Sequence, residues 1–269
     1  MKVAFLGGGN MANALIGGLL AKGFDARAIS VIEVSPAARE RLAAHRVRVS
    51  TAPDAATGGA DVLVLAVKPQ DMRRALASLG APVGGKLVIS IAAGVRIASL
   101  SRWLGGHRKI VRCMPNTPAL IAAGISALFA PAEVSPEERR RAETVLAAAG
   151  EVVWVDDERL IDVVTAVSGN GPAYVFWLME QLAAFAERSG IPPQDAQRLA
   201  LHTVLGAAKL AAGSAEPPSA LRRNVTSRGG TTEAALKAFD AEQLAERLAR
   251  ALEAAVRRGG ELDEELGKD

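Results

Sequence analysis

The spacing of hydrophobic residues divides this chain into two stretches. Through residue 156, short apolar runs of strand length alternate with segments that have helical apolar spacing. The predicted strands are residues 3–6, 28–34, 47–50, 61–67, 86–92, 109–114, 122–130 and 151–155. The run at 61–67 is almost entirely apolar, as in a strand that is covered on both faces of a parallel sheet. This alternation predicts an α/β domain.

Beyond residue 156 the pattern is helical and rich in alanine, with no β-branched run of strand length. We therefore predict two domains, residues 1–156 and residues 157–269. A helix over residues 174–186 is apolar almost all the way round, so it needs cover on every side. In a domain this small we expect that cover to come from a second copy, which predicts an obligate homodimer. A last long helix is expected to begin at Asp240, with a core stripe at Leu244, Leu248, Leu252 and Val256.

Three glycines directly follow the first predicted strand. Gly7-x-Gly9-x-x-Ala12 has the spacing of the dinucleotide-binding fingerprint, and it lies between a strand and a helix. The first glycine permits a sharp turn, the second lets the backbone approach a pyrophosphate, and Ala12 allows the helix to pack closely on the strand. The helix N-terminus then offers unpaired N–H groups to the phosphates. This stretch therefore predicts a nucleotide site.

Residues at the end of the second predicted strand bear on the choice of cofactor. Glu33 is placed where an acid would hold a ribose 2′-hydroxyl and repel a 2′-phosphate. Ser35 and Arg39 have the opposite chemistry, since a hydroxyl and a guanidinium can hold that phosphate. Ser35 followed by Pro36 also fits a simple helix cap. These residues leave both NADH and NADPH open.

Two loops in the helical half carry glycines and hydroxyl groups before a predicted helix. The sequence SGNGPAY over residues 168–174 predicts an exposed helix N-terminus at Pro172. The sequence VTSRGGTTE over residues 225–233 repeats this chemistry before a short helix. Backbone N–H groups and hydroxyls there can cradle an anion, and the second loop is a candidate carboxylate site. A plain cap and turn is the alternative for each loop.

Composition narrows the chemistry further. Lys and Arg number 32 against 29 Asp and Glu, and aromatic residues make up 4%, so no nucleic-acid-binding surface is indicated. The 3 His residues and the single cysteine, Cys113, lie outside any metal-binding or nucleophile motif, so we expect no metal and no protein nucleophile. A nicotinamide can supply hydride without either. Without an apolar run near about 18 residues or a clear signal peptide, we expect a cytoplasmic protein that does not cross a membrane.

Six motifs taken together resemble pyrroline-5-carboxylate reductase. They are GGGNMANAL at 7–15, AVKPQ at 66–70, SIAAGV at 90–95, RCMPNTPA at 112–119, SGNGPAY at 168–174 and VTSRGGTT at 225–232. The resemblance implies a Rossmann-like dinucleotide-binding domain followed by an all-helical dimerisation domain. It implies reduction of 1-pyrroline-5-carboxylate to L-proline with NAD(P)H, the last step of proline biosynthesis. It also implies a homodimer, with dimers assembled into a larger ring.

The resemblance also assigns site residues position by position. Ser35 occupies the family position beside the 2′-phosphate, which favours NADPH, with NADH possible. Thr232 is the candidate for the hydrogen bond or proton to the ring nitrogen, and Glu158 matches a family acid near the substrate, with a structural role as the alternative. The residues implied to line the cofactor are Gly7, Gly8, Gly9, Asn10, Met11, Ser35, Ala66, Val67, Lys68, Pro69, Ala92, Ala93, Gly94 and Asn224. Those implied to hold the substrate are Glu158, Ser168, Gly169, Gly229, Gly230, Thr231 and Thr232.

Two positions depart from the family pattern. Asn170 replaces the usual serine of SGSGPAY, which should change little. Arg228 replaces the usual proline of TSPGGTT, which removes a fixed φ angle and adds a cation near the proposed carboxylate site. Two other functions stay as alternatives. A related imine or β-hydroxyacid reductase should carry a catalytic Lys or Asp in its helical domain, and a nucleotide-binding regulatory module has no need of the carboxylate loop.

Overall fold

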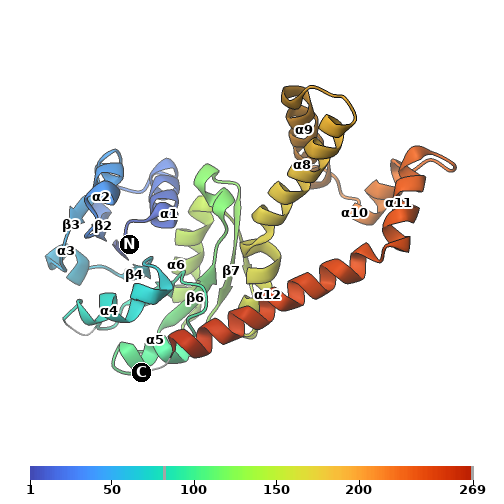
Figure 1. Cartoon of the computed structure of the whole chain (residues 1–269). Coiled ribbons are helices and arrows are strands. Elements are labelled where there is room, and N and C mark those ends of the chain that lie inside the picture. Colours follow the sequence, from blue (N-terminus) through green and yellow to red (C-terminus); the bar gives the residue numbers. More distant parts are fainter. Residues whose placement is uncertain (81–82, 268–269) are drawn as a thin grey trace. The chain divides into compact units, whose positions relative to one another are not determined.

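The computed structural model of the chain describes residues 1–80 and 83–267 (Figure 1). These residues form a sheet with the strand order β3-β2-β1-β4-β5-β6-β7-β8. The strands are β1 (Val3–Leu6), β2 (Ile29–Ile32), β3 (Arg48–Ser50), β4 (Val62–Leu65), β5 (Leu87–Ser90), β6 (Ile110–Met114), β7 (Gly124–Phe129) and β8 (Gly150–Trp154). Each predicted strand is confirmed, although most are shorter than the apolar run that predicted them.

The sheet is parallel except where β6 pairs with β7, which is antiparallel. β1 lies between β2 and β4, so the strand order reverses at β1. Connections on either side of such a point diverge, and a crevice opens at the carboxyl ends of the strands. The predicted glycine loop begins at this place because it directly follows β1.

Helices cover both faces of the sheet. α1 (Asn10–Ala21) and α6 (Pro136–Leu146) pack into one apolar core, and α4 (Met72–Ala77) and α5 (Ile97–Trp103) pack into the other. Further helices of this part are α2 (Pro36–Ala43), α3 (Ala55–Gly58) and α7 (Leu160–Val164), with 3₁₀ turns at Ala26–Ala28, Pro69–Asp71, Thr117–Ile121 and Ala147–Ala149. Because strands such as β4 contact a core on each face, every residue of β4 is buried.

The rest of the chain is helical, as expected after residue 156. Its helices are α8 (Gly171–Arg188), α9 (Pro193–Ala212), α10 (Pro218–Asn224), α11 (Thr231–Ala241) and α12 (Leu244–Leu266). The chain divides into two compact units, one of Met1–Asn170 with Ala255–Asp269 and one of Gly171–Ala254. α7 contacts β6 and β7, and Leu266 packs against the core that contains α5, so both segments belong to the first unit.

The last long helix differs from the prediction. Asp240 lies inside α11, and α12 begins only at Leu244, because Gln243 has a φ of +53° that interrupts the helical path. The expected start at Asp240 is therefore wrong. Leu244 and Leu248 are exposed in the single chain, so the stripe they begin is not part of its core.

α8 is the helix that the sequence predicts to be covered on all sides. In the single chain it packs on α9 through Ala183, Ala196 and Ala200, while Trp177 and Phe185 are 59% and 66% exposed. Within residues 1–80 and 83–267 of one copy, these side chains therefore lack the cover that the sequence predicts.

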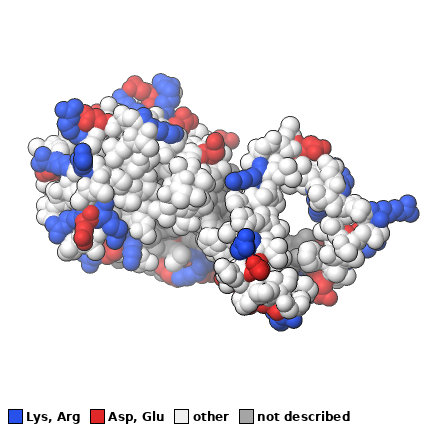
Figure 2. Space-filling model, turned by 90° about the horizontal axis from the view of Figure 1, so that it is seen from above, with Lys and Arg blue, Asp and Glu red and all other residues white. Residues whose placement is uncertain are grey.

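Charged residues are interspersed rather than segregated on the face shown in Figure 2, where Asp and Glu lie among Lys and Arg. Among the described residues, no helix combines the length and the apolar character needed to cross a membrane.

Candidate dinucleotide and carboxylate sites

The glycine loop has the backbone that its sequence predicts. Gly7 has a φ of +98°, and a Cβ added there would lie 2.7 Å from the carbonyl oxygen of Ala66, so this position requires glycine. Gly9 is the N-cap of α1, which has no side-chain cap and no acid in its first turn. A Cβ at Gly9 would meet nothing within 4 Å, so there is open space beside this N-cap, and the first amides of α1 are those of Asn10 and Met11. This arrangement fits a pyrophosphate.

A cavity of about 720 Å³ lies at the carboxyl ends of β1, β2 and β4. It brings together two separate predicted motifs, the glycine loop and the segment that follows β4. Predicted cofactor residues that line it are Gly7, Gly9, Ser35, Ala66, Val67 and Lys68. Pro69 begins the 3₁₀ turn that directly follows.

The carboxylate of Glu33 lies between the glycine loop and the start of α2. Its Oε2 accepts a hydrogen bond from the Gly8 amide at 2.7 Å, and its Oε1 accepts one from the Ser35 amide at 2.6 Å. The Ser35 hydroxyl accepts a hydrogen bond from the Ala38 amide at 3.4 Å, so the predicted helix cap is confirmed. An acid and a hydroxyl therefore both line the cavity at the end of β2.

The cations near this cavity differ from those expected. Arg41 and Arg74 line it, whereas Arg39 is not among its lining residues. Residues two apart on a helix are separated by about 200°, so Arg39 and Arg41 leave α2 in nearly opposite directions. Arg41 is therefore a better candidate than Arg39 for a phosphate ligand. Arg41 lies three residues after Ala38, which also lines the cavity, so helical spacing could have identified it.

The loop after β5 is the third predicted cofactor segment. β5 is the neighbour of β4, so residues 92–94 lie at the same edge of the sheet. Ala92 is buried, and Gly94 has a φ of +64°. A Cβ at Gly94 would lie 3.0 Å from the Leu262 side chain of α12. Ala92, Ala93 and Gly94 are not among the lining residues of the cavity at β1, β2 and β4.

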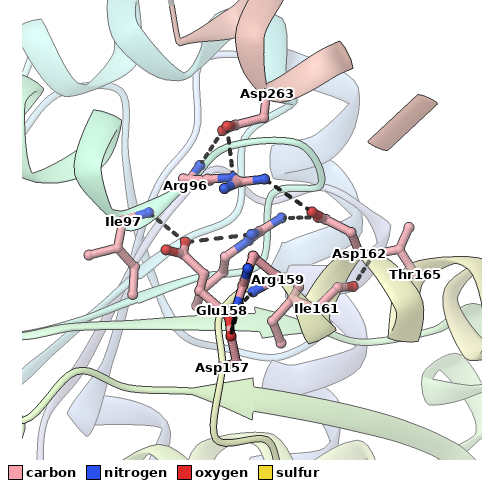
Figure 3. A network of polar contacts seen from close by, with 10 residues as sticks. Arg96, Ile97, Asp157, Glu158, Arg159, Ile161, Asp162, Thr165 and Asp263 are labelled. Atoms are coloured by element: carbon pink, nitrogen blue, oxygen red, sulfur yellow. Dashed lines mark hydrogen bonds and ion pairs between the residues drawn. The ribbon is translucent and has the colours of Figure 1, made fainter. Parts of the chain in front are cut away.

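Glu158 lies in a network of charged residues within the first unit (Figure 3). Its Oε1 accepts a hydrogen bond from the Ile97 amide at 2.8 Å and lies 3.5 Å from Nη1 of Arg112. Arg112 is only 1% exposed and pairs with Asp162 at 2.9 Å. These partners give Glu158 a structural role, and its contact with substrate stays a prediction. This network was not predicted from the sequence, although an arginine inside the apolar run IVRCM was a signal for it.

Cys113 is buried in β6, as predicted for a small hydrophobic residue. Burial raises the pKa of its thiol far above the usual range. A thiol that does not ionise is not a nucleophile, so Cys113 is unsuited to that role.

The segment SGNGPAY does not begin a free helix. Residues Thr165–Gly169 form a π-helical turn that continues from α7, and the Asn170 amide donates to the Thr165 carbonyl at 2.8 Å. The Ser168 hydroxyl donates to the Val164 carbonyl at 3.1 Å. α8 begins at Gly171, so the predicted helix start at Pro172 is confirmed. The expectation that this N-terminus is exposed is wrong, because the π-helical turn leads directly into α8 and uses the Asn170 amide. Contact of Ser168 and Gly169 with substrate stays a prediction.

The loop at 225–233 does begin a short helix, as predicted. Gly229 has a φ of +73°, and its amide donates to the Glu233 carboxylate at 2.7 Å. Gly230 is the N-cap of α11 and makes no side-chain cap, so the first-turn amides at Thr231 and Thr232 are available to an anion. The nearby Asn224 ends α10 and donates to Glu216 at 3.0 Å. Its predicted contact with cofactor is not tested by this arrangement.

Comparisons with known proteins agree with both parts of the chain. Residues 158–262 match the family model described as pyrroline-5-carboxylate reductase dimerisation, and residues 2–94 match the model described as NADP oxidoreductase, coenzyme F420-dependent. The pyrroline-5-carboxylate reductase of Pseudomonas aeruginosa is 46% identical over 269 residues, which cover 99% of this chain and 98% of that protein.

Solved structures give the same result. A pyrroline-5-carboxylate reductase from Coxiella burnetii has a TM-score of 0.91 at 39% identity, covering 97% of this chain and 98% of its own. The Plasmodium falciparum enzyme, solved with NADP bound, has a TM-score of 0.83 at 25% identity, covering 98% of both chains. These similarities extend over almost the whole chain, from the glycine loop to the helical part. The chain therefore belongs to the pyrroline-5-carboxylate reductase family.

Proposed function

We propose that this chain reduces 1-pyrroline-5-carboxylate to L-proline with NAD(P)H, the last step of proline biosynthesis. The observation that carries the proposal is the match to the Pseudomonas aeruginosa pyrroline-5-carboxylate reductase, 46% identical over 99% of this chain. A regulatory module without turnover has no use for the uncapped N-terminus of α11. A cytoplasmic location fits a reaction that draws on NAD(P)H.

Residues of the first unit are proposed to hold the cofactor. Pyrophosphate fits beside Gly9, where the amides of Asn10 and Met11 begin an uncapped helix next to open space. Ser35 and Arg41 line the cavity at the end of β2 and offer a hydroxyl and a cation to a 2′-phosphate, while Glu33 opposes that charge. When bound, the nicotinamide supplies a hydride to the imine carbon.

The substrate is proposed to bind through its carboxylate to residues 229–232. Thr231 and Thr232 offer first-turn amides at the N-terminus of α11, where the helix dipole favours negative charge. The Glu233 carboxylate occupies the Gly229 amide, so binding falls mainly to the two threonines. The Thr232 hydroxyl is proposed to donate a hydrogen bond to the ring nitrogen, which makes the imine carbon more electrophilic.

The chain is proposed to act as a homodimer that joins through its helical part. The exposed apolar side chains of α8, among them Trp177 and Phe185, support this because a helix of this kind needs cover. The matched model for residues 158–262 is described by dimerisation. Assembly of dimers into a larger ring is a further proposal that rests on the family resemblance. Light scattering during size-exclusion chromatography measures the molar mass of the assembly, which tests both the dimer and the larger ring.

The activity is tested with purified protein, NADPH and pyrroline-5-carboxylate, by following the absorbance of the reduced cofactor. Loss of absorbance that requires both enzyme and substrate, with proline formed in equal amount, is the expected result. Repeating the assay with NADH gives the cofactor preference. Turnover of an acyclic imine or a β-hydroxyacid, with none of pyrroline-5-carboxylate, would replace the proposal with the related-reductase alternative.

A further inference from the structure

We propose that Arg96 and Asp263 are positioning residues of the cofactor site, and that the last turns of α12 hold the loop after β5 in place. The inference rests on the proposed function, in which residues 92–94 line the cofactor. Arg96 is the N-cap of α5 and follows this loop directly, whereas Asp263 lies 167 residues further along the chain. All of these residues belong to the first compact unit.

Asp263 binds Arg96 through both the backbone and the side chain. The Arg96 amide donates to Oδ1 of Asp263 at 3.0 Å, and the Arg96 Nε lies 2.8 Å from Oδ2 of the same carboxylate. The side chains are 34% and 15% exposed, so water only partly screens this pair. Figure 3 shows the Asp263 carboxylate directed at Arg96 from α12. One carboxylate thus fixes both the position of the backbone and the direction of the guanidinium.

A second acid holds the next residue of the same turn. The Ile97 amide donates to Glu158 at 2.8 Å, and the Arg96 Nη2 lies 3.4 Å from Asp162. Asp162 is in turn held by the buried Arg112 of β6. The first two amides at the start of α5 therefore each bind a carboxylate from a distant segment, and α5 has no side-chain cap of its own. The start of α5 is anchored to the sheet on one side and to α12 on the other.

The loop itself contacts α12 through apolar atoms. A Cβ at Gly94 would lie 3.0 Å from the Leu262 side chain, so the helix packs against the loop backbone at van der Waals distance. Leu266 packs against the core cluster that contains Ala92 and Val95. Asp263 lies between these two leucines in the sequence, and its carboxylate adds an ion pair with Arg96 to their apolar contact. The loop is held by packing and by an ion pair from one helix.

Loss of the Asp263 carboxylate leaves the Arg96 amide without its acceptor and frees the last turns of α12. The loop at 92–94 then populates conformations that do not fit the cofactor, and binding weakens in proportion to the fraction lost. The first-turn amides of α11 are untouched by this change. The predicted effect is selective: cofactor affinity falls while the KM for pyrroline-5-carboxylate at saturating cofactor does not change.

The test compares the wild-type chain with Asp263→Ala and Asp263→Asn. We expect the Kd of NADPH, measured by titration calorimetry, to rise about fivefold or more in Asp263→Ala, since a charge-assisted hydrogen bond is lost. Asp263→Asn keeps an acceptor without the charge and should lie between Asp263→Ala and the wild type. Arg258→Ala is the matched control, because Arg258 is exposed on the same helix and pairs with Glu261 and Glu265. Its Kd should stay within about twofold of the wild type.

A lower melting temperature for Asp263→Ala with an unchanged Kd would show a merely structural pair and overturn the inference. If Asp263→Ala does not fold, the test uses Asp263→Asn instead. An unchanged Kd of NADPH in Asp263→Asn would then overturn the inference. Failure of the proposed function can be told apart from failure of this inference. A wild-type chain that binds NADPH but does not reduce pyrroline-5-carboxylate still permits the comparison of Kd values.

Discussion

The Glu33 carboxylate accepts a hydrogen bond from the Gly8 amide at 2.7 Å and lies against the glycine loop. Its second oxygen accepts from the Ser35 amide, so both of these hydrogen-bond partners are neutral backbone groups. Among the residues that the structure describes, no cation forms an ion pair with Glu33. Arg41 and Arg74 line the same cavity and carry the opposite charge. Lys68 and Asp71 also line it, and Asp71 pairs with Arg74. Cofactor preference therefore depends on the balance between Glu33 and the cations at this cavity.

Glu33→Gln should shift that preference toward NADPH. Glutamine keeps an acceptor for the Gly8 amide but removes the charge that repels a 2′-phosphate. We expect the ratio of kcat/KM for NADPH to that for NADH to rise about fivefold, or on the order of 1 kcal/mol. Steady-state kinetics with both cofactors measures this ratio, and a ratio that falls or stays constant would remove Glu33 from cofactor selection.

Gly7→Ala and Gly9→Ala should separate folding from cofactor binding. A Cβ at Gly7 lies 2.7 Å from the Ala66 oxygen at a φ of +98°, so this variant should lose about 2 kcal/mol or more of unfolding free energy. A Cβ at Gly9 meets nothing within 4 Å, so that variant should keep its stability and lose NAD(P)H affinity. Urea unfolding and cofactor titration measure the two effects. Full affinity in Gly9→Ala would place the pyrophosphate elsewhere.

Thr232→Ala should lower turnover at least about tenfold, a change of about 1.4 kcal/mol in the barrier. The reason is loss of the proposed hydrogen bond to the ring nitrogen. Thr232→Ser is the matched control because it keeps a hydroxyl at the same position in the first turn of α11. Initial rates at saturating substrate test the pair, and equal turnover in the alanine variant would exclude this role.

Arg112→Met should destabilise the chain by about 3 kcal/mol, because it leaves two acids without their buried partner. Arg112 is 1% exposed and lies 2.9 Å from Asp162. Urea unfolding gives the difference. Arg27→Ala provides the contrast, since Arg27 is 90% exposed in its pair with Asp25 and its loss should not measurably change the unfolding curve. Equal curves for both variants would contradict the assigned role of the network.

Acid should weaken the start of α6 through Glu138. Burial acts to raise the pKa of this carboxyl, but hydrogen bonds from Lys109 and Ser135 together hold the pKa below its usual 4.5. A folded pKa below the unfolded one stabilises the fold above about pH 4.5, and this contribution is lost as pH falls through the folded pKa.

Glu138→Gln should therefore be less stable than the wild type near neutral pH, and the difference should shrink in acid. Urea unfolding at several values between about pH 7 and pH 3 measures it. A difference that does not depend on pH would mean that the charge of Glu138 contributes nothing.

Much of the fold can be predicted from local sequence patterns. The apolar runs predicted each of the described strands. The signal is strongest for strands such as β4, which are buried on both faces and need continuous apolar residues. The capping box of Ser135 and Glu138 joins residues only three apart, so it is a local feature of the chain. The residues that line the site were harder to predict from local patterns. The side of α2 on which a residue lies decides that Arg41, and not Arg39, lines the cavity.

The strands are predictable from the sequence alone, as are the glycine loop and the loop before α11, because each depends on residues close together in the chain. Contacts between distant segments came from the folded chain: Asp263 binds Arg96, and α7 and the end of α12 belong to the same compact unit as the sheet. The tertiary structure also places Ser168 and Gly169, the first two residues of SGNGPAY, inside a π-helical turn. These features depend on which distant segments meet, and the hydrophobic period of one segment carries no information about its partner.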